Sequence, residues 1–225
     1  MKRIPTPRKT PTQARSRMMV EAILTATAHI IVKHGYSGTN TNLVAQLAGV
    51  SVGSLYQYFP NKDSLIAALH QREAQALAEM IRDITAQYPQ VNSLHEHLSL
   101  LVRTLLTHYR EETQLLRVLE KNFSALIDQP CEQFYKTEIP NLLQAMLNRW
   151  QDSLWRPNLP MAAWMTAHMI RSMLQAYVVE TPEIAPREME QAIVRSLMAL
   201  LCGVESEART PGSSRPLTLS LQPAS

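Results

Sequence analysis

Apolar residues recur every three to four positions through most of this chain, which is the spacing that buries one face of an α-helix. Strand-like alternation of apolar and polar residues is absent, and Leu, Ala, Met, Gln and Glu, which favour helix, are abundant. The pattern predicts an all-α protein with about nine helices. The predicted helices cover residues 13–34, 41–48, 52–59, 62–87, 93–110, 113–127, 133–154, 161–179 and 186–201. Within 133–154 the helix is expected to kink or break at Pro140, and the alternative is that Pro140 stands in the first turn of a new helix.

Residues 39–62 are predicted to form two short helices joined by a tight turn and followed by a third helix. Gly49 stands where the end of the first helix favours a residue with positive φ. The first helix is expected to bury Leu43, Val44, Leu47 and Ala48. The candidate N-terminal capping residues of the three helices are Thr39 or Asn40, Ser51, and Asn61.

The second short helix has one apolar face and one small, uncharged face. At 100° per residue the apolar face carries Val52, Leu55 and Phe59, and the opposite face carries Gly53, Ser54 and Gln57. Small side chains with hydrogen-bonding groups suit entry into the major groove of DNA, where base edges are read. From the pattern alone, a plain three-helix subdomain with exposed tyrosines remains the alternative.

Phosphate contacts are expected beside this face. Tyr56 and Tyr58 lie on its two flanks, where a phenolic hydroxyl can donate to a phosphate oxygen. Lys62 adds a positive charge at the start of the next helix, whose N-terminus also favours anions. The predicted DNA-binding residues are Thr41, Asn42, Val52, Gly53, Ser54, Tyr56, Gln57, Tyr58 and Lys62.

The string GYSGTNTNLVAQLAGVSVGSLYQYFPNKDSLIAAL resembles the N-terminal DNA-binding domain of the TetR family of bacterial repressors. The shared points are Gly-Tyr after the first helix, Ala-Gly-Val-Ser at the turn, Leu-Tyr-x-Tyr-Phe, and x-Lys-x-x-Leu, within about a quarter of the chain. Many family members carry Lys and Thr near Val52-Gly53-Ser54, so the operator sequence stays open. The resemblance implies a homodimer on a near-palindromic double-stranded operator, and most members of the family are repressors released by a small molecule.

The resemblance also assigns roles to the later helices. The helix at 62–87 would connect the DNA-binding part to the rest, and its apolar positions do continue past that part without a break. The last two helices would form a four-helix bundle with those of a second copy. The predicted dimer-interface residues are Met165, Met169, Met173, Ala176, Ile193, Leu197, Leu200 and Leu201.

Charge is divided unevenly along the chain. Residues 1–62 hold eight Lys and Arg against one Glu, a net charge of +7, which leaves −4 for the remainder of a chain of net charge +3. A basic N-terminal segment on an acidic body indicates a polyanionic partner at one end. The predicted divisions are a disordered basic arm (1–12), a helix-turn-helix DNA-binding domain (13–62), a helical ligand-binding and dimerisation domain (63–204) and a disordered tail (205–225).

Other classes of protein are disfavoured. No apolar run is long enough to cross a bilayer, and the N-terminus lacks the apolar core of a signal peptide, so the expected location is cytoplasmic. No Ser-His-Asp order, P-loop, dinucleotide turn or Cys-x-x-Cys appears, so neither an enzyme nor a cofactor is predicted. His95 and His97 are two residues apart and fall on different faces of a helix, so no metal site is predicted.

Met and Trp crowd the stretch from 146 to 173, where they favour either ordinary core and dimer packing or an adaptable apolar pocket. The candidate ligand-binding residues are Met80, Arg103, Phe123, Met146, Trp150, Trp164, His168 and Arg171. Two hypotheses follow. The first is a repressor released from DNA by a small, largely apolar ligand. The second is a DNA-binding regulator without an inducer, whose body only dimerises or binds a partner protein.

Overall fold

The computed structural model describes residues 14–87, 91–123, 133–155, 158–180 and 182–203, and these ranges contain nine α-helices and no strand. The predicted all-α class is therefore confirmed. The predicted arm (1–12) and tail (205–225) lie outside the described residues. No helix within those ranges is long and apolar enough to cross a membrane.

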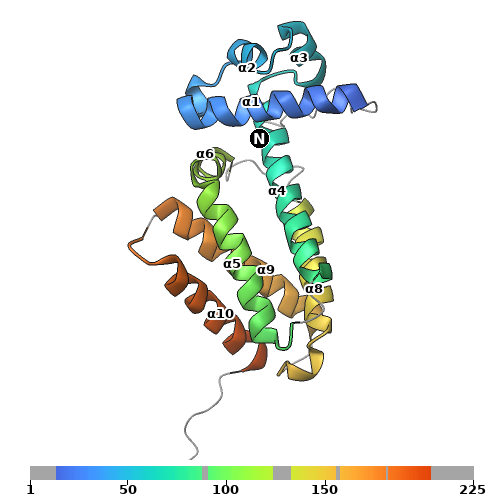
Figure 1. Ribbon diagram of the computed structural model, residues 1–225, viewed down its shortest axis with the longest axis vertical. Helices are drawn as coiled ribbons and strands as arrows, with labels where there is room; N and C mark the ends of the chain where they lie inside the picture. Colours follow the sequence, from blue (N-terminus) through green and yellow to red (C-terminus); the bar gives the residue numbers. More distant parts are fainter. Residues whose placement is uncertain (1–13, 88–90, 124–132, 156–157, 181, 204–225) are drawn as a thin grey trace, which may run out of the picture.

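A small helical unit stands on a longer helical body (Figure 1). The unit is formed by α1 (Ala14–Gly38), α2 (Thr41–Leu47) and α3 (Val52–Tyr58), and α4 (Lys62–Gln87) runs from it into the body. Within the body α8 lies against α4 and α9, and α10 lies against α5. The remaining elements are α5 (Leu94–Glu111), α6 (Thr113–Phe123), a π-helical turn (Phe134–Glu138), α8 (Ile139–Asn148), a 3-10 turn (Gln151–Ser153), α9 (Leu159–Glu180) and α10 (Pro186–Cys202).

The turns of the small unit follow the chemistry of the sequence. Asn40, Ser51 and Asn61 each accept a hydrogen bond from a backbone N–H two or three residues later, at 2.8 to 3.0 Å. These bonds satisfy donors that have no partner inside their helices. Gly49 adopts a φ of 68°, which an L-residue with a side chain rarely takes, and so turns the chain between α2 and α3.

Two hydrophobic cores divide the protein. The N-terminal core joins α1, α2 and α3 to the first turns of α4, and the body core joins α4, α5, α8, α9 and α10. Leu65 and Leu69 belong to the N-terminal core, so the predicted boundary after residue 62 cuts through that core. Leu115 and Leu119 of α6 also belong to it, although they lie some fifty residues later in the sequence.

Two expected core positions of α2 are exposed instead. Leu43 and Leu47 face solvent, while Val44 and Ala45 are buried. Because α2 has only seven residues, its contact with the rest of the unit covers a narrow stripe. The 3.6-residue period identified a helix here but placed its buried face about one residue out of phase.

The segment around Pro140 resolves an alternative left open by the sequence. α8 begins at Ile139, so Pro140 occupies the first turn of that helix, where its missing N–H removes no helical hydrogen bond. The five residues before α8 form a π-helical turn. The irregularity expected at Pro140 is thus a π-helical turn that leads directly into α8. Such turns are frequent at functional sites.

The contribution of α6 to the N-terminal core can be measured. We expect Leu119→Ala to lower the free energy of unfolding by about 2–5 kcal/mol, because it opens a cavity at a fully buried position. Leu47→Ala, at a side chain that is 54% exposed, should change it by less than about 0.5 kcal/mol. Urea denaturation gives both values, and equal effects would contradict the assignment of Leu119 to this core.

Candidate functional site

The exposed surface of α3 carries the predicted base-reading residues. Leu55 and Phe59 point into the N-terminal core, and Gly53 and Gln57 lie exposed on the other side of the helix. Ser54 is half-buried, and its hydroxyl lies 2.8 Å from the hydroxyl of the capping residue Ser51. The outward face thus combines a residue without a side chain and an unhindered amide, as the sequence predicts.

Two positions of α3 differ from expectation. Tyr58 is only 6% exposed and packs in the N-terminal core, because it lies one turn after Leu55 on the buried side of α3. Its side chain is therefore part of the scaffold and not an exposed phosphate contact. Val52, expected on the apolar face, is 38% exposed, because it is the first residue of α3 and extends beyond the core.

Three of the predicted DNA-binding residues, Thr41, Tyr56 and Lys62, together line one recess of about 370 Å³. The hydroxyls of Thr41 and Tyr56 lie 3.0 Å apart, so one donates to the other and the second proton remains available. The N-termini of α2 and α4 both open beside this recess. Converging hydroxyls, a lysine and helix N-termini make a surface suited to phosphate oxygens.

Lys62 also holds the small unit together. Its Nζ donates to the carbonyl oxygen of Tyr36 at 2.9 Å and lies 4.2 Å from the centre of the Tyr36 ring. The Tyr36 hydroxyl donates to Oδ1 of Asp63 at 2.5 Å, and this bond, together with burial, raises the pKa of Tyr36 to about 12. The pair formed by Tyr36 and Asp63 fixes the start of α4 to the end of α1, a role that the sequence pattern did not reveal.

A second candidate site is a narrow cavity inside the body. It is enclosed by α4, α5, α8 and α9 and by the π-helical turn, and its volume is about 30 Å³. This volume holds about one or two water molecules and no metabolite. The lining is mostly aliphatic, with residues Leu77, Ile81, Leu105, Tyr109, Tyr135, Ile139, Leu143, Ala167, His168, Ile170, Arg171 and Leu174.

Two of the candidate ligand-binding residues, His168 and Arg171, form the polar edge of the cavity. The Arg171 guanidinium lies 3.8 Å from the centre of the Tyr135 ring, so a charged group stacks on the residue supplied by the π-helical turn. His168 Nδ1 lies 2.9 Å from the carbonyl oxygen of Trp164 and must donate to it, which leaves Nε2 as an acceptor when the ring is neutral.

The other candidate ligand residues lie elsewhere. Trp164 stacks on His168 at 4.2 Å but is 52% exposed, so it covers the histidine from outside. Met80 and Met146 pack in or against the body core without lining the cavity. Arg103 lies on the surface between α5 and α10, because its position on α5 faces away from the cavity. The side chain of Phe123 is outside the described residues.

Trp150 has a structural role. Its Nε1 donates to Nδ1 of His97 at 3.1 Å, so Nδ1 must be unprotonated. His97 is 1% exposed, and burial together with the nearby charge of Arg149 lowers the pKa of His97 below its ordinary value. A histidine considered for metal binding is therefore a neutral core residue that orients a tryptophan.

The predicted dimer residues divide into two groups. Ile193, Leu197 and Leu201 are buried within one protomer, because the apolar face of α10 packs on α5, so they cannot face a partner. Met165 and Ala176 are exposed on α9, and Met169, Met173 and Leu200 are half-buried. Met161 and Val179 extend the exposed apolar stripe of α9 at helical spacing.

Comparisons with known proteins identify the class. The family model for bacterial regulatory proteins of the tetR family matches residues 23–69, and the model for a tetracyclin repressor-like C-terminal domain matches residues 93–203. An all-α protein with a helix-turn-helix and this C-terminal domain is a DNA-binding transcription regulator. The chain belongs to the TetR family, whose members are regulators and not enzymes.

The similarity to individual proteins of known sequence covers smaller parts of the chain. The chain is 33% identical over 84 residues to the fatty acid metabolism regulator protein of Bacillus subtilis, and 45% identical over 51 residues to the transcriptional repressor KstR of Mycolicibacterium smegmatis. These matches span 35% and 23% of the chain and 43% and 25% of the two relatives. The structure of FadR from Bacillus subtilis in complex with stearoyl-CoA superposes with a TM-score of 0.61 at 18% identity, covering 82% of this chain and 98% of FadR.

The buried His97 predicts a pH dependence of stability. Its pKa is lowered on folding, so the unfolded chain binds more protons below about pH 6.5, and stability should fall as the pH drops through that value. We expect the loss to approach about 1.4 kcal/mol per pH unit for this group. Urea denaturation from pH 7 to 5.5 should show a shallower slope for His97→Gln, and an unchanged slope for the exposed control His95→Gln. Equal slopes in all three proteins would contradict the assignment.

Proposed function

We propose that this protein is a dimeric repressor that leaves a near-palindromic operator when a small, largely apolar ligand enters the body cavity. The observation that supports the proposal most directly is the course of α4. Its first turns pack in the N-terminal core through Leu65 and Leu69, and Leu77 and Ile81 of the same helix line the cavity. A change in the cavity therefore acts on a helix that begins at the DNA-binding surface.

Each protomer would place α3 in a major groove. Gln57 would read a base edge with Ser54 and Asn42, while Gly53 allows the backbone to approach closely. Thr41, Tyr56 and Lys62 would hold the phosphates beside it through the recess that they line. One short helix reads few base pairs, so a two-fold dimer with grooves about 34–36 Å apart is expected to supply specificity.

The dimer would form through α9 and α10. Met165 and Ala176 lie on the exposed apolar stripe of α9 and are not needed by the protomer core. The surface of α10 that faces away from α5 includes the small residues Ala192 and Ala199, which permit close approach of a second helix. This assigns α10 two roles, with its large apolar residues inside the protomer and its small ones toward the partner.

Ligand entry requires the cavity to expand, since about 30 Å³ accommodates no metabolite. The π-helical turn is the part best suited to move, because it supplies Tyr135, whose ring is held by the stacked Arg171. Displacing Tyr135 would expose an aliphatic channel with one arginine at its edge. An acyl chain with an anionic end matches this lining, and a structural relative is known in complex with stearoyl-CoA.

The protein would leave its operator because the ligand binds one position of α4 more tightly than the other. A ligand that wedges α4 away from α8 and α9 changes the tilt of α4 and the separation of the two recognition helices in the dimer. A shift of a few ångströms breaks the match to grooves one helical turn apart, so the second half-site loses its contacts. The usual scale of such coupling is about 1–3 kcal/mol, or about 5–150-fold in operator affinity.

The small volume of the cavity favours a second candidate function. If the cavity never opens, the body serves only to dimerise or to bind a partner protein, and no small molecule alters DNA binding. Apolar packing throughout the lining is consistent with that alternative. The two candidates are separated by the ligand test below.

One prediction of this proposal concerns how the protein reads the DNA sequence. An operator can be selected from a random DNA pool with the purified protein, and Gln57→Ala should weaken binding to it by about 1–3 kcal/mol and relax one position of the selected sequence. Gln75→Ala, at an exposed position of α4 in the body, should leave both unchanged. If the sequence selected by the Gln57 variant matched that of the wild type, the proposed orientation of α3 on DNA would be wrong.

A further prediction concerns assembly. The wild type should have the mass of a dimer at micromolar concentration by light scattering, and Ala176→Glu should be monomeric because it places a charge in an apolar interface. Ala86→Glu introduces the same change at an exposed position of α4 and should remain a dimer. A monomeric wild type would contradict the proposed interface.

The ligand test adds stearate or stearoyl-CoA to the protein bound to the selected operator. Coenzyme A, which lacks the acyl chain, is the control. An acyl chain should reduce operator affinity by about 5–150-fold, measured by fluorescence anisotropy. Ala167→Val fills the cavity and should abolish the response while DNA binding persists. Ala163→Val adds the same bulk at a buried position of α9 outside the cavity and should still respond. Absence of any response in the wild type would favour the partner-protein function.

A further inference from the structure

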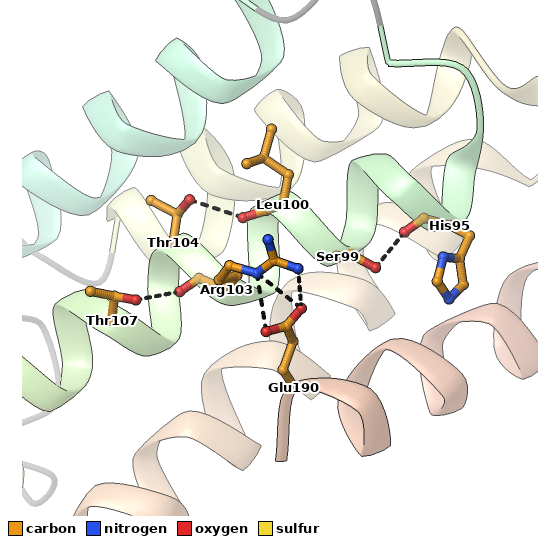
Figure 2. A network of polar contacts seen from close by, with 7 residues as sticks. All are labelled: His95, Ser99, Leu100, Arg103, Thr104, Thr107 and Glu190. Carbon is orange, nitrogen blue, oxygen red and sulfur yellow. Dashed lines mark hydrogen bonds and ion pairs between the residues drawn. The ribbon is translucent and has the colours of Figure 1, made fainter. Parts of the chain in front are cut away.

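A groove lies between α5 and α10, and the residues of α5 that line it are not those that line the cavity. Figure 2 shows Arg103 of α5 and Glu190 of α10 meeting across it. Its volume is about 910 Å³, within the usual range of about 300–1,000 Å³ for small-molecule sites. Its floor is apolar and formed by Leu106, Val194 and Met198. The walls carry His95, Ser99, Arg103, Thr107, Arg110, Pro186, Arg187, Glu190, Gln191 and Arg195.

The groove has an excess of positive charge. Four arginines face one glutamate, although residues 63–225 as a whole carry a net charge of −4. Glu190 is already engaged, since its two carboxylate oxygens accept from Nε and Nη2 of Arg103 at 2.9 to 3.2 Å. Arg110, Arg187 and Arg195 form no ion pair within the described part of the chain. Unneutralised arginines gathered in one groove are suited to an anion from outside the protein.

The charged donors that line the groove are guanidinium groups. Ser99 and Thr107 donate their hydroxyl protons to the carbonyl oxygens of His95 and Arg103, each at 2.8 Å, so these hydroxyls face the groove only as acceptors (Figure 2). Arginine presents N–H groups in a planar fork that matches the oxygens of phosphate. Arginines from both helices therefore allow one ligand to be gripped from two sides.

The composition of the groove argues against a protein occupant. No Phe, Tyr or Trp is among the residues that line it, and the apolar residues on its floor are Leu106, Val194 and Met198. Protein interfaces depend on a central aromatic or aliphatic anchor surrounded by a polar rim. This groove offers no such aromatic anchor, and four arginines stand in its walls, whereas the centre of a protein interface is depleted in charge.

We propose that the groove between α5 and α10 binds a small polyanion, a metabolite carrying two or more phosphate groups. Arg187 and Arg195 of α10 and Arg110 of α5 are its phosphate ligands, and Arg103 becomes a fourth when it leaves Glu190. Glu190 lowers the affinity for anions because it occupies Arg103 and repels negative charge. The site is separate from the apolar cavity and takes a ligand of opposite chemistry, so it is independent of the proposed apolar inducer.

The test measures binding of sodium tripolyphosphate to the full-length protein by isothermal titration calorimetry at constant ionic strength. The double variant Arg187→Gln and Arg195→Gln should weaken binding by at least about tenfold, since hydrogen bonds between charged groups are lost. Glu190→Gln should tighten binding several-fold, on the order of the effect of one like charge. Glu188→Gln removes the same charge from the first turn of α10 outside the groove and should stay close to wild type. Thermal melting confirms that each variant is folded.

The basic N-terminal region also attracts polyphosphate and must be separated from the groove. The double variant Arg15→Gln and Arg17→Gln removes two exposed charges of α1 and should leave the affinity of the groove site unchanged. Loss of binding in this variant, with normal binding in the Arg187 and Arg195 variant, would overturn the proposal. Equal competition by sulfate at the same ionic strength would show general charge screening and would also overturn it. Tighter binding of a poly-glutamate peptide would assign the groove to an acidic protein segment instead.

Discussion

The structure depends on α4 being buried in two separate cores. Its first turns supply Leu65 and Leu69 to the N-terminal core, and its later turns supply Ala78 and Ile84 to the body core. A helix is stiff along its axis, so neither core can shift against the other without tilting α4 or losing buried apolar area. The contacts of Tyr36 with Lys62 and Asp63 fix the upper end of this helix to α1. The position of the recognition helix is therefore set by packing far below it.

The sequence predicted those features that depend on neighbouring residues. Helix-capping side chains and the positive φ at Gly49 are determined within a few residues, so the helix-turn-helix was located to within one or two positions. Periodicity could not show which neighbour covers an apolar face, because that depends on tertiary packing. Hence Tyr58 was placed on the surface and Leu197 at the dimer interface, whereas both are buried inside the protomer. The pair formed by Trp150 and His97 spans 53 residues and left no pattern in the sequence.

Within the body, α5 separates two environments of opposite character. Leu105 and Tyr109 line the apolar cavity on one side, and Arg103 and Thr107 line the basic groove on the other. Residues only two positions apart on one helix thus face different surroundings, an apolar cavity on one side and a solvent-exposed groove on the other. Such a division lets a single helix contact two classes of molecule without placing charge in the core. It also explains why Arg103, predicted for the cavity from its sequence position in the body, lies on the opposite surface.

Because α6 contributes to the N-terminal core, the DNA-binding part cannot be moved to another protein without regard to that helix. Leu115 and Leu119 cover α1 from a helix that follows both α4 and α5, so an excised fragment ending at residue 87 would leave that patch of α1 bare. Transplanting the recognition domain of one such regulator onto the body of another would succeed only if the new α6 fits the surface of α1. Recombination within this architecture is thus restricted by one small interface, and exchange of DNA specificity is easier by substitution on α3 than by swapping domains.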